Sequence, residues 1–139
     1  MIAKYGQGVS QPPSPIIAPT PTVMTTRAWA DYGLVDSGNG RKLERYGDYT
    51  AVRPEPQCLW TPRLDDARWT QADAIFDPAD EEDDGHWRFN RRPPERFPLS
   101  WQEVKFYGRF TNFRHLAFFP EQQANWAWMD AEIRAASGQ

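Results

Sequence analysis

The last quarter of the chain carries the pattern that most restricts its fold. Polar and charged side chains alternate with apolar or small ones over residues 105–110, which is the period-two pattern of a strand. After a short connector, a second apolar run covers residues 116–119. Pro120 then stands where the first turn of a helix would begin, a place where its missing N–H costs nothing. The pattern predicts a strand pair that leads into one helix over residues 120–136.

The expected helix is amphipathic and has a defined end. Trp126, Met129, Ile133 and Ala136 recur at helical spacing, and Gly138 follows the last of them. Thirteen prolines and nine glycines favour many turns and short elements elsewhere in the 139 residues. The fold class expected is α+β, mostly antiparallel hairpins or a meander with one C-terminal amphipathic helix.

Composition excludes several classes of protein. The formal net charge is −3, so the chain has no overall basic character for binding nucleic acid. One cysteine cannot form an intrachain disulfide, and with two histidines it cannot build a usual structural zinc site. The sequence has no run of eighteen apolar residues and no clear secretory signal, which predicts a cytoplasmic protein without a membrane span.

Three regions are expected along the chain. Residues 1–28 form a flexible Pro-rich tail, because five of the thirteen prolines lie in the first 23 residues. An alternative is that Met24 is the natural start and the preceding residues are an upstream extension. Residues 29–119 form a β-rich module, and residues 120–136 form the helix.

The segment 30–54 predicts three antiparallel strands. Its turn signals are Ser37-Gly38-Asn39-Gly40 and Gly47-Asp48. Between them, alternation in residues 41–46 places Lys42 and Glu44 on the face opposite Leu43. A scaffold role is the expected one for these strands.

The middle of the chain offers two features with plain structural interpretations. Residues 64–69 are expected to form a single helical turn capped by an Asp. Cys58 lies among apolar neighbours, which predicts an unreactive thiol. Residues 77–84 hold six acidic side chains and are expected to form a solvated loop; their spacing does not fit a calcium loop.

Residues 86–115 interleave basic and aromatic side chains, and two interpretations fit. Such a surface can bind single-stranded nucleic acid by neutralising phosphates and stacking bases. A half-buried strand, for example Trp87-Arg88-Phe89, has the same sequence pattern, with its aromatic residues facing inward and its arginines facing outward. The candidate RNA contacts are Arg88, Arg91, Arg92 and Lys105.

The sequence motifs identify no catalytic residue. The chain has no Gly-rich phosphate loop and no evident nucleophile or metal site. His115 could act as a general base, but a structural hydrogen bond is the simpler role.

Three stretches resemble a known family: residues 32–64, residues 85–126, and within the latter the segment FFPEQQANW. They are similar to the N-terminal part of bacterial class I S-adenosylmethionine (SAM)-dependent methyltransferases related to the 23S rRNA cytosine-C5 methyltransferases. Gln122 and Asn125 align with the signature Phe-Leu-Asp-Gln-Arg-Xaa-Asn-Arg, and Glu121 takes its acidic place. Gln123 and Trp126 stand where the rRNA enzymes have Arg, so the resemblance indicates a methyltransferase more directly than an rRNA substrate.

The resemblance implies a two-part enzyme, with a β-rich N-terminal module followed by a domain that binds SAM. The chain is then expected to be a catalytically incomplete N-terminal part without its own cofactor, and RNA, including ribosomal RNA, is the implied partner. Its cleft-lining candidates are Arg109, Arg114, His115, Gln122 and Asn125. The alternative is a protein-interaction or dimerisation module with no catalytic or nucleic-acid role.

Overall fold

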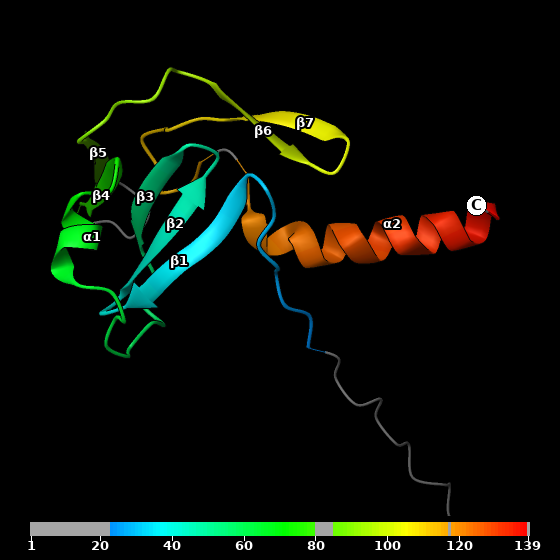
Figure 1. The fold of residues 1–139 in the computed structure, drawn as a ribbon, viewed down its shortest axis with the longest axis horizontal. Coiled ribbons are helices and arrows are strands. Elements are labelled where there is room, and N and C mark those ends of the chain that lie inside the picture. The colour runs from blue at the N-terminus through cyan, green and yellow to red at the C-terminus, as the bar shows by residue number, and fades with distance from the viewer. Residues whose placement is uncertain (1–22, 80–84, 117, 139) are drawn as a thin grey trace, which may run out of the picture.

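The computed structural model describes residues 23–79, 85–116 and 118–138. It confirms the α+β class and the C-terminal helix (Figure 1). A five-stranded sheet has the order β1 (Tyr32–Gly38), β2 (Arg41–Tyr46), β3 (Tyr49–Pro54), β4 (Ala74–Pro78), β5 (Gly85–Phe89). A separate two-stranded sheet pairs β6 (Phe97–Trp101) with β7 (Val104–Gly108), and the helices are α1 (Asp66–Thr70), the 3₁₀ turn η1 (Pro120–Gln122) and α2 (Gln123–Ser137).

The first three strands form the antiparallel meander that the turn signals predict. Asn39 and Gly40 close the first hairpin with φ angles of 49° and 72°, and Gly47 closes the second with φ of 57°. These positive φ values explain why asparagine and glycine occupy the turns. In the resulting register Glu44 lies opposite Ala51 on β3.

Strand β4 was not expected from the sequence, and it changes the topology. It pairs parallel with β3 through Ala51–Ala74 and Val52–Ile75, and α1 lies in the crossover between them. An Asp caps α1 as predicted: the Asp65 carboxylate accepts a hydrogen bond from Arg68 N at 3.1 Å. Asp77 belongs to β4, where a loop was expected; residues 80–84 of the acidic run lie outside the described residues.

The five-stranded sheet is covered on both faces. Leu43 and Val52 face one side, where they pack with Trp69, Ala72 and Ile75 around α1. The opposite face carries a second cluster, to which the hairpin β6–β7 and the segment before α2 contribute: Tyr32, Tyr46, Ala51, Ala74, Phe97, Leu99 and Leu116. Polar residues on the second face are therefore buried, although alternation alone would leave them in water.

The partner of β7 differs from the one that the apolar run 116–119 suggested. Strand β7 pairs with β6, and none of Leu116, Phe118 and Phe119 is in a strand. The reason is that this run contributes side chains to the core instead of backbone to a ladder: Leu116 is fully buried, and Phe118 packs against the same cluster.

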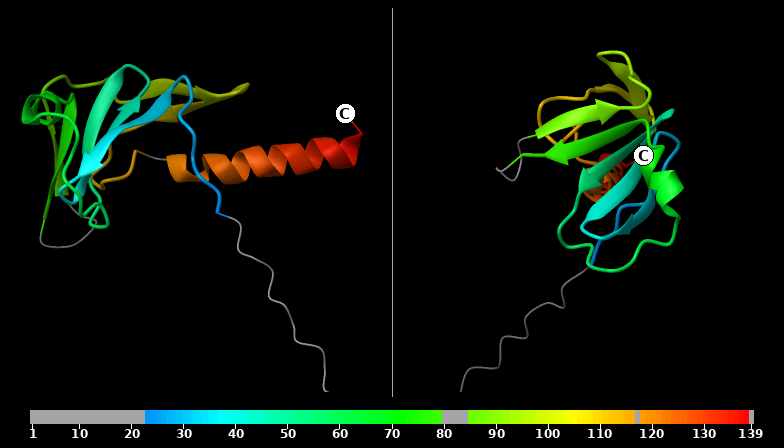
Figure 2. Two further views of the ribbon diagram at one scale, coloured as in Figure 1. Left: turned by 60° about the horizontal axis from the view of Figure 1, so that its bottom comes forward. Right: turned by 90° about the vertical axis from the view of Figure 1, so that its left-hand side faces the viewer.

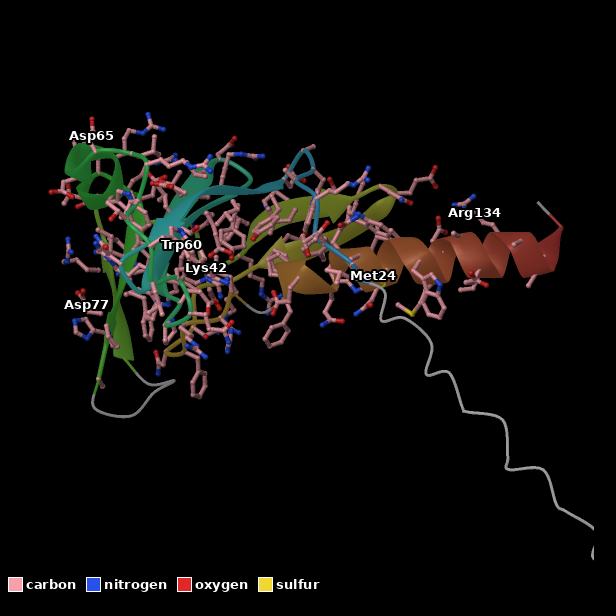
Figure 3. The ribbon with its side chains drawn as sticks, turned by 90° about the horizontal axis from the view of Figure 1, so that it is seen from below. Met24, Lys42, Trp60, Asp65, Asp77 and Arg134 are labelled. Atoms are coloured by element: carbon pink, nitrogen blue, oxygen red, sulfur yellow. The ribbon has the colours of Figure 1, made fainter. Side chains whose placement is uncertain are left out.

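Helix α2 projects away from the sheets (Figures 1 and 2). At its root, the Trp126 ring packs against Trp101 and Trp29, with centroids 5.6 Å and 6.4 Å away. No residue of α2 is buried, and Gly138 ends it in the left-handed conformation. In Figure 3, Arg134 lies toward the end of α2, far from the five-stranded sheet, where Lys42 is labelled.

Candidate functional site

The candidate cleft residues fall into two groups on neighbouring segments. The first group is Arg109, just after β7, together with Arg114 and His115 on the connector, which we define as residues 111–119. Arg109 N, at the end of β7, donates to Leu116 O at 3.3 Å, so the backbone brings Arg109 alongside the segment that holds Arg114 and His115. The guanidinium of Arg109 forms an ion pair with Glu95 at 3.3 Å.

The connector is fixed by both its side chains and its backbone. Leu116 is buried in the core, and Phe118 packs edge-on against Tyr46 and Phe106. The indole Nε1 of Trp87 donates to Phe113 O at 3.2 Å. The His115 ring lies 4.9 Å from that of Phe119. The described part of the connector is therefore held in place although it has no regular secondary structure.

A buried ion pair lies between the connector and the sheet. Glu44 is fully buried, and Arg53 is 4% exposed. Arg53 donates from Nε and Nη2 to the two oxygens of Glu44 at 2.8 Å and 3.0 Å, a two-point contact, and the Tyr32 hydroxyl donates to the same carboxylate at 2.9 Å. The remaining Arg53 nitrogen, Nη1, donates to Arg114 O at 3.2 Å.

The charges in this cluster set one another's protonation. Burial alone would raise the pKa of the Glu44 carboxyl, but hydrogen bonds from Arg53 and its charge, together with Lys42 and Tyr32, hold that pKa below its usual range. Burial and the adjacent Glu44 carboxylate raise the pKa of the Tyr32 and Tyr46 phenols. At neutral pH the cluster therefore holds an ionised Glu44–Arg53 pair with two neutral phenols.

The second group of cleft candidates lies at the start of α2. Gln122 Oε1 accepts a hydrogen bond from Asn125 Nδ2 at 2.8 Å, so the two signature residues face one another. The chain before β1 fastens this turn: Thr26 Oγ1 donates to Glu121 O at 3.0 Å, and Arg27 N donates to the side chain of Gln123 at 3.1 Å. No sequence pattern predicts this contact between segments about 95 residues apart.

The candidate RNA contacts lie on exposed positions, but their charges are not equally available. Arg88 pairs with Asp77 at 3.4 Å. Arg91 pairs with Asp73 at 2.7 Å and also donates to Asp48 O. Arg92 stacks 5.0 Å from the Phe89 ring centroid, and Lys105 has no ion-pair partner among the described residues. In β5 the side chains alternate as the structural interpretation predicts, with Trp87 and Phe89 packed against the core.

A hollow beside Arg92 adds a further feature to this basic face. It has a volume of about 420 Å³ and is lined by Phe89, Arg92, Pro93, Pro94, Glu95 and Phe110. An aromatic face next to a guanidinium is a combination that suits a nucleobase and its phosphate. The basic and aromatic residues were evident in the sequence, but the hollow that they line was not predicted.

An apolar groove lies at the root of α2, beside the hairpin β6–β7. Its volume is about 380 Å³, and its lining residues are Trp101, Val104, Phe106, Tyr107, Phe118 and Trp126. Further along α2, Trp128, Met129 and Ile133 are exposed. Helix α2 therefore leaves several apolar side chains exposed.

Among the described residues, no group of three or more His, Cys, Asp or Glu side chains is arranged to hold a metal ion. No described helix is long and apolar enough to cross a membrane. Cys58 is buried.

Comparison with known proteins gives one informative result. No protein-family profile and no curated protein matches the chain. Solved structures do match it, and one of them is similar to most of the chain. This is a SAM-dependent methyltransferase from Agrobacterium tumefaciens, with 46% sequence identity and a TM-score of 0.75 over 82% of this chain. The chain spans 36% of the length of that methyltransferase, so it is similar in sequence and fold to part of such a protein.

Proposed function

We propose that this chain is the substrate-facing part of a SAM-dependent methyltransferase. The observation that carries the proposal is the similarity to the Agrobacterium methyltransferase, at 46% identity over 82% of this chain. Identity at this level over a whole module supports a shared role as well as a shared fold. The expected division into a β-rich module, residues 29–119, and a helix that leads out of it is part of the same proposal.

We further propose that the chain does not bind SAM or transfer a methyl group by itself. Its support is that the match covers 36% of the Agrobacterium chain. Calorimetric titration of SAM into the 139-residue chain, with the Agrobacterium protein as the positive control, tests this. We expect heat of binding only from the control; saturable binding by the 139-residue chain would overturn the proposal.

A chimera tests the methyltransferase role directly. Residues 23–138 of this chain would replace the matching part of the Agrobacterium protein. We expect the chimera to bind SAM and to retain the methyl transfer that the Agrobacterium protein performs. A folded chimera that binds SAM but has lost all transfer that the Agrobacterium protein performs would contradict a shared substrate-facing role.

We propose RNA as the substrate class, bound through the hollow at Arg92 and the exposed amine of Lys105. Several neighbouring arginines are already paired with carboxylates, so we expect the phosphate contacts to be few. Binding of a labelled single-stranded RNA should weaken with salt, and Lys105→Ala should reduce the log–log salt slope by about 1. Arg134→Ala, which removes a cation paired with Asp130 far along α2, is the control and should leave the slope unchanged.

The alternative function is protein interaction through the apolar surface at α2. It is favoured by one observation: Trp128, Met129 and Ile133 are 56%, 45% and 65% exposed and lie on the same helix as the groove at its root. Sedimentation of the chain and of a Met129→Ser/Ile133→Ser variant tests it. A concentration-dependent dimer that the variant abolishes supports this function, whereas a monomer at all concentrations contradicts self-association.

A further inference from the structure

The Glu44–Arg53 pair has an unusual position for two charges. Both side chains are buried between the sheet and the connector, and ions in such places lose much of their hydration. Replacing a buried ion pair by apolar residues of similar volume is often neutral or stabilising. Stability of the fold therefore does not by itself explain why charges lie here.

The hydrogen bonds of the pair point to its role. Two Arg53 nitrogens and the Tyr32 hydroxyl are directed at Glu44, and all of these residues belong to the β1–β3 meander. One bond leaves the meander, from Arg53 Nη1 to Arg114 O, across 61 residues of sequence. The pair thus links the scaffold to the segment that carries Arg114 and His115.

The guanidinium geometry makes this link directional. The group is planar, and its fork to Glu44 fixes the plane and hence the direction of the third nitrogen. The position of the Arg114 carbonyl is then set by Glu44 through Arg53. A lysine could keep the charge near Glu44 but has one nitrogen, so it cannot keep the two-point contact and reach the carbonyl as well.

We propose that Glu44 and Arg53 are positioning residues, which hold the connector so that Arg114 and His115 keep one orientation on the substrate-facing surface. The functional half of this inference rests on the proposed RNA role; the structural half does not. The proposal gives a role to two residues that the sequence analysis placed in a scaffold.

The Trp87 indole is a local reporter for the connector. Its Nε1–H donates to the carbonyl of Phe113, the residue before Arg114. The indoles of Trp29 and Trp60 donate to Ser100 O and Ser37 O, both outside the connector, and serve as internal references. Nitrogen-15 NMR resolves indole N–H signals, and Trp87→Phe assigns the reporter.

The test compares Arg53→Lys with Arg91→Lys. Arg91 is a matched control because it also makes a two-point contact with a carboxylate, Asp73, and also donates to a backbone carbonyl, Asp48 O. We expect Arg53→Lys to shift the Trp87 signal and to speed its hydrogen exchange at least tenfold, with Trp29 and Trp60 unchanged. Arg91→Lys should leave all three signals in place.

Two results would overturn the structural half. One is an unchanged Trp87 signal in folded Arg53→Lys, and the other is an equal change in Arg91→Lys. The double variant Glu44→Leu/Arg53→Met keeps the buried volume without charges and provides a second route to a folded protein. It should lose the Trp87 bond as well, and its retention of that bond would also overturn the inference.

RNA affinity tests the functional half. Arg53 is buried and cannot touch RNA, so weaker binding by Arg53→Lys would report the connector and not a lost contact. We expect the Kd to rise at least threefold. A shifted Trp87 signal with an unchanged Kd would overturn the positioning role, whereas absence of RNA binding by the unmodified chain would refute the RNA proposal and leave the structural link intact.

Discussion

Gly38 ties the loop of residues 55–64 to the first hairpin. Its φ is +149°, and a Cβ there would lie 2.6 Å from Trp60 O and from Pro62 N. Gly38→Ala should therefore lower the free energy of unfolding by more than the about 1–3 kcal/mol of an unfavourable φ alone, because backbone must also move. Urea denaturation measures this loss.

Gly40→Ala separates the two causes. Gly40 also has a positive φ, +72°, but a Cβ there would meet no atom within 4 Å. We expect a loss of about 1–2 kcal/mol from the backbone conformation alone. Equal losses in the two variants would show that the close approach of the loop has no energetic consequence.

Ionisation of the Asp73 carboxyl should make the free energy of unfolding depend on pH. Burial would raise the pKa of its carboxyl, but hydrogen bonds from Arg91 and Thr50 lower that pKa. A folded-state pKa below the unfolded one means that the stabilisation is present above the unfolded pKa of about 3.9 and disappears as the pH falls through the folded pKa. Asp73→Asn should cost about 1–2 kcal/mol at pH 7, allowing for its partial exposure.

The measurement for Asp73 is urea denaturation at several pH values between 7 and 2.5. The difference in unfolding free energy between the parent chain and Asp73→Asn should shrink as the acid range is entered. Asp130→Asn, in an exposed pair with Arg134 on α2, is the control and should change little at any pH. A constant difference for Asp73→Asn down to pH 2.5 would contradict the lowered pKa.

At the scale of elements, the sequence predicted the turns and the helix cap, because each of these depends on a few neighbouring residues. The hairpins β1–β2 and β2–β3 depend on Gly and Asn at positive φ, and the cap of α1 depends on one Asp, so short sequence windows contain them. Strand β4 depends on a parallel pairing across α1, which leaves no local signal. Strand β6 contains Pro98, which argues against a strand in any local interpretation.

In the candidate site, too, some residues were predicted from the sequence and others were not. Sequence resemblance identified Gln122 and Asn125, and the structure places these two within one hydrogen bond of each other. Glu44 and Arg53 were missed because alternation in β2 predicts which face a side chain takes but not whether that face is covered. The cover comes from the hairpin β6–β7 and the connector, which are distant in sequence. Opposite charges on paired strands were the only available signal.

Helix α2 should respond differently to substitutions at its root and at its far end. The Trp126 ring packs against Trp101 and Trp29, whereas Met129 and Ile133 are exposed. Trp126→Ala should lower stability by about 2–3 kcal/mol, below the range for a fully buried Trp because this ring is half-buried. Met129→Ser/Ile133→Ser should change it by less than about 0.5 kcal/mol per residue. Thermal denaturation of dilute protein checks this. Comparable losses of stability in the two variants would contradict the inference that Met129 and Ile133 contribute little to packing.

At the scale of the whole molecule, one core cluster joins the two sheets. Tyr46 and Ala51 come from the five-stranded sheet, Phe97 and Leu99 from the hairpin, and Leu116 from the connector. Because the same contacts bury residues of every part, neither sheet should persist when the cluster is disrupted. We therefore expect residues 23–138 to unfold in one cooperative transition.

Leu116→Ala tests this cooperativity, since its side chain is fully buried and lies between the sheets. The substitution should cost about 2–5 kcal/mol through lost burial and the cavity that remains. Leu59→Ala removes the same atoms from a side chain that is 85% exposed and should be nearly neutral. The transitions followed by far-UV circular dichroism and by tryptophan fluorescence should move together in Leu116→Ala. If the fluorescence transition moved alone, the hairpin and the connector would be separable from the five-stranded sheet, and the tie through Arg53 could not act as a link between rigid parts.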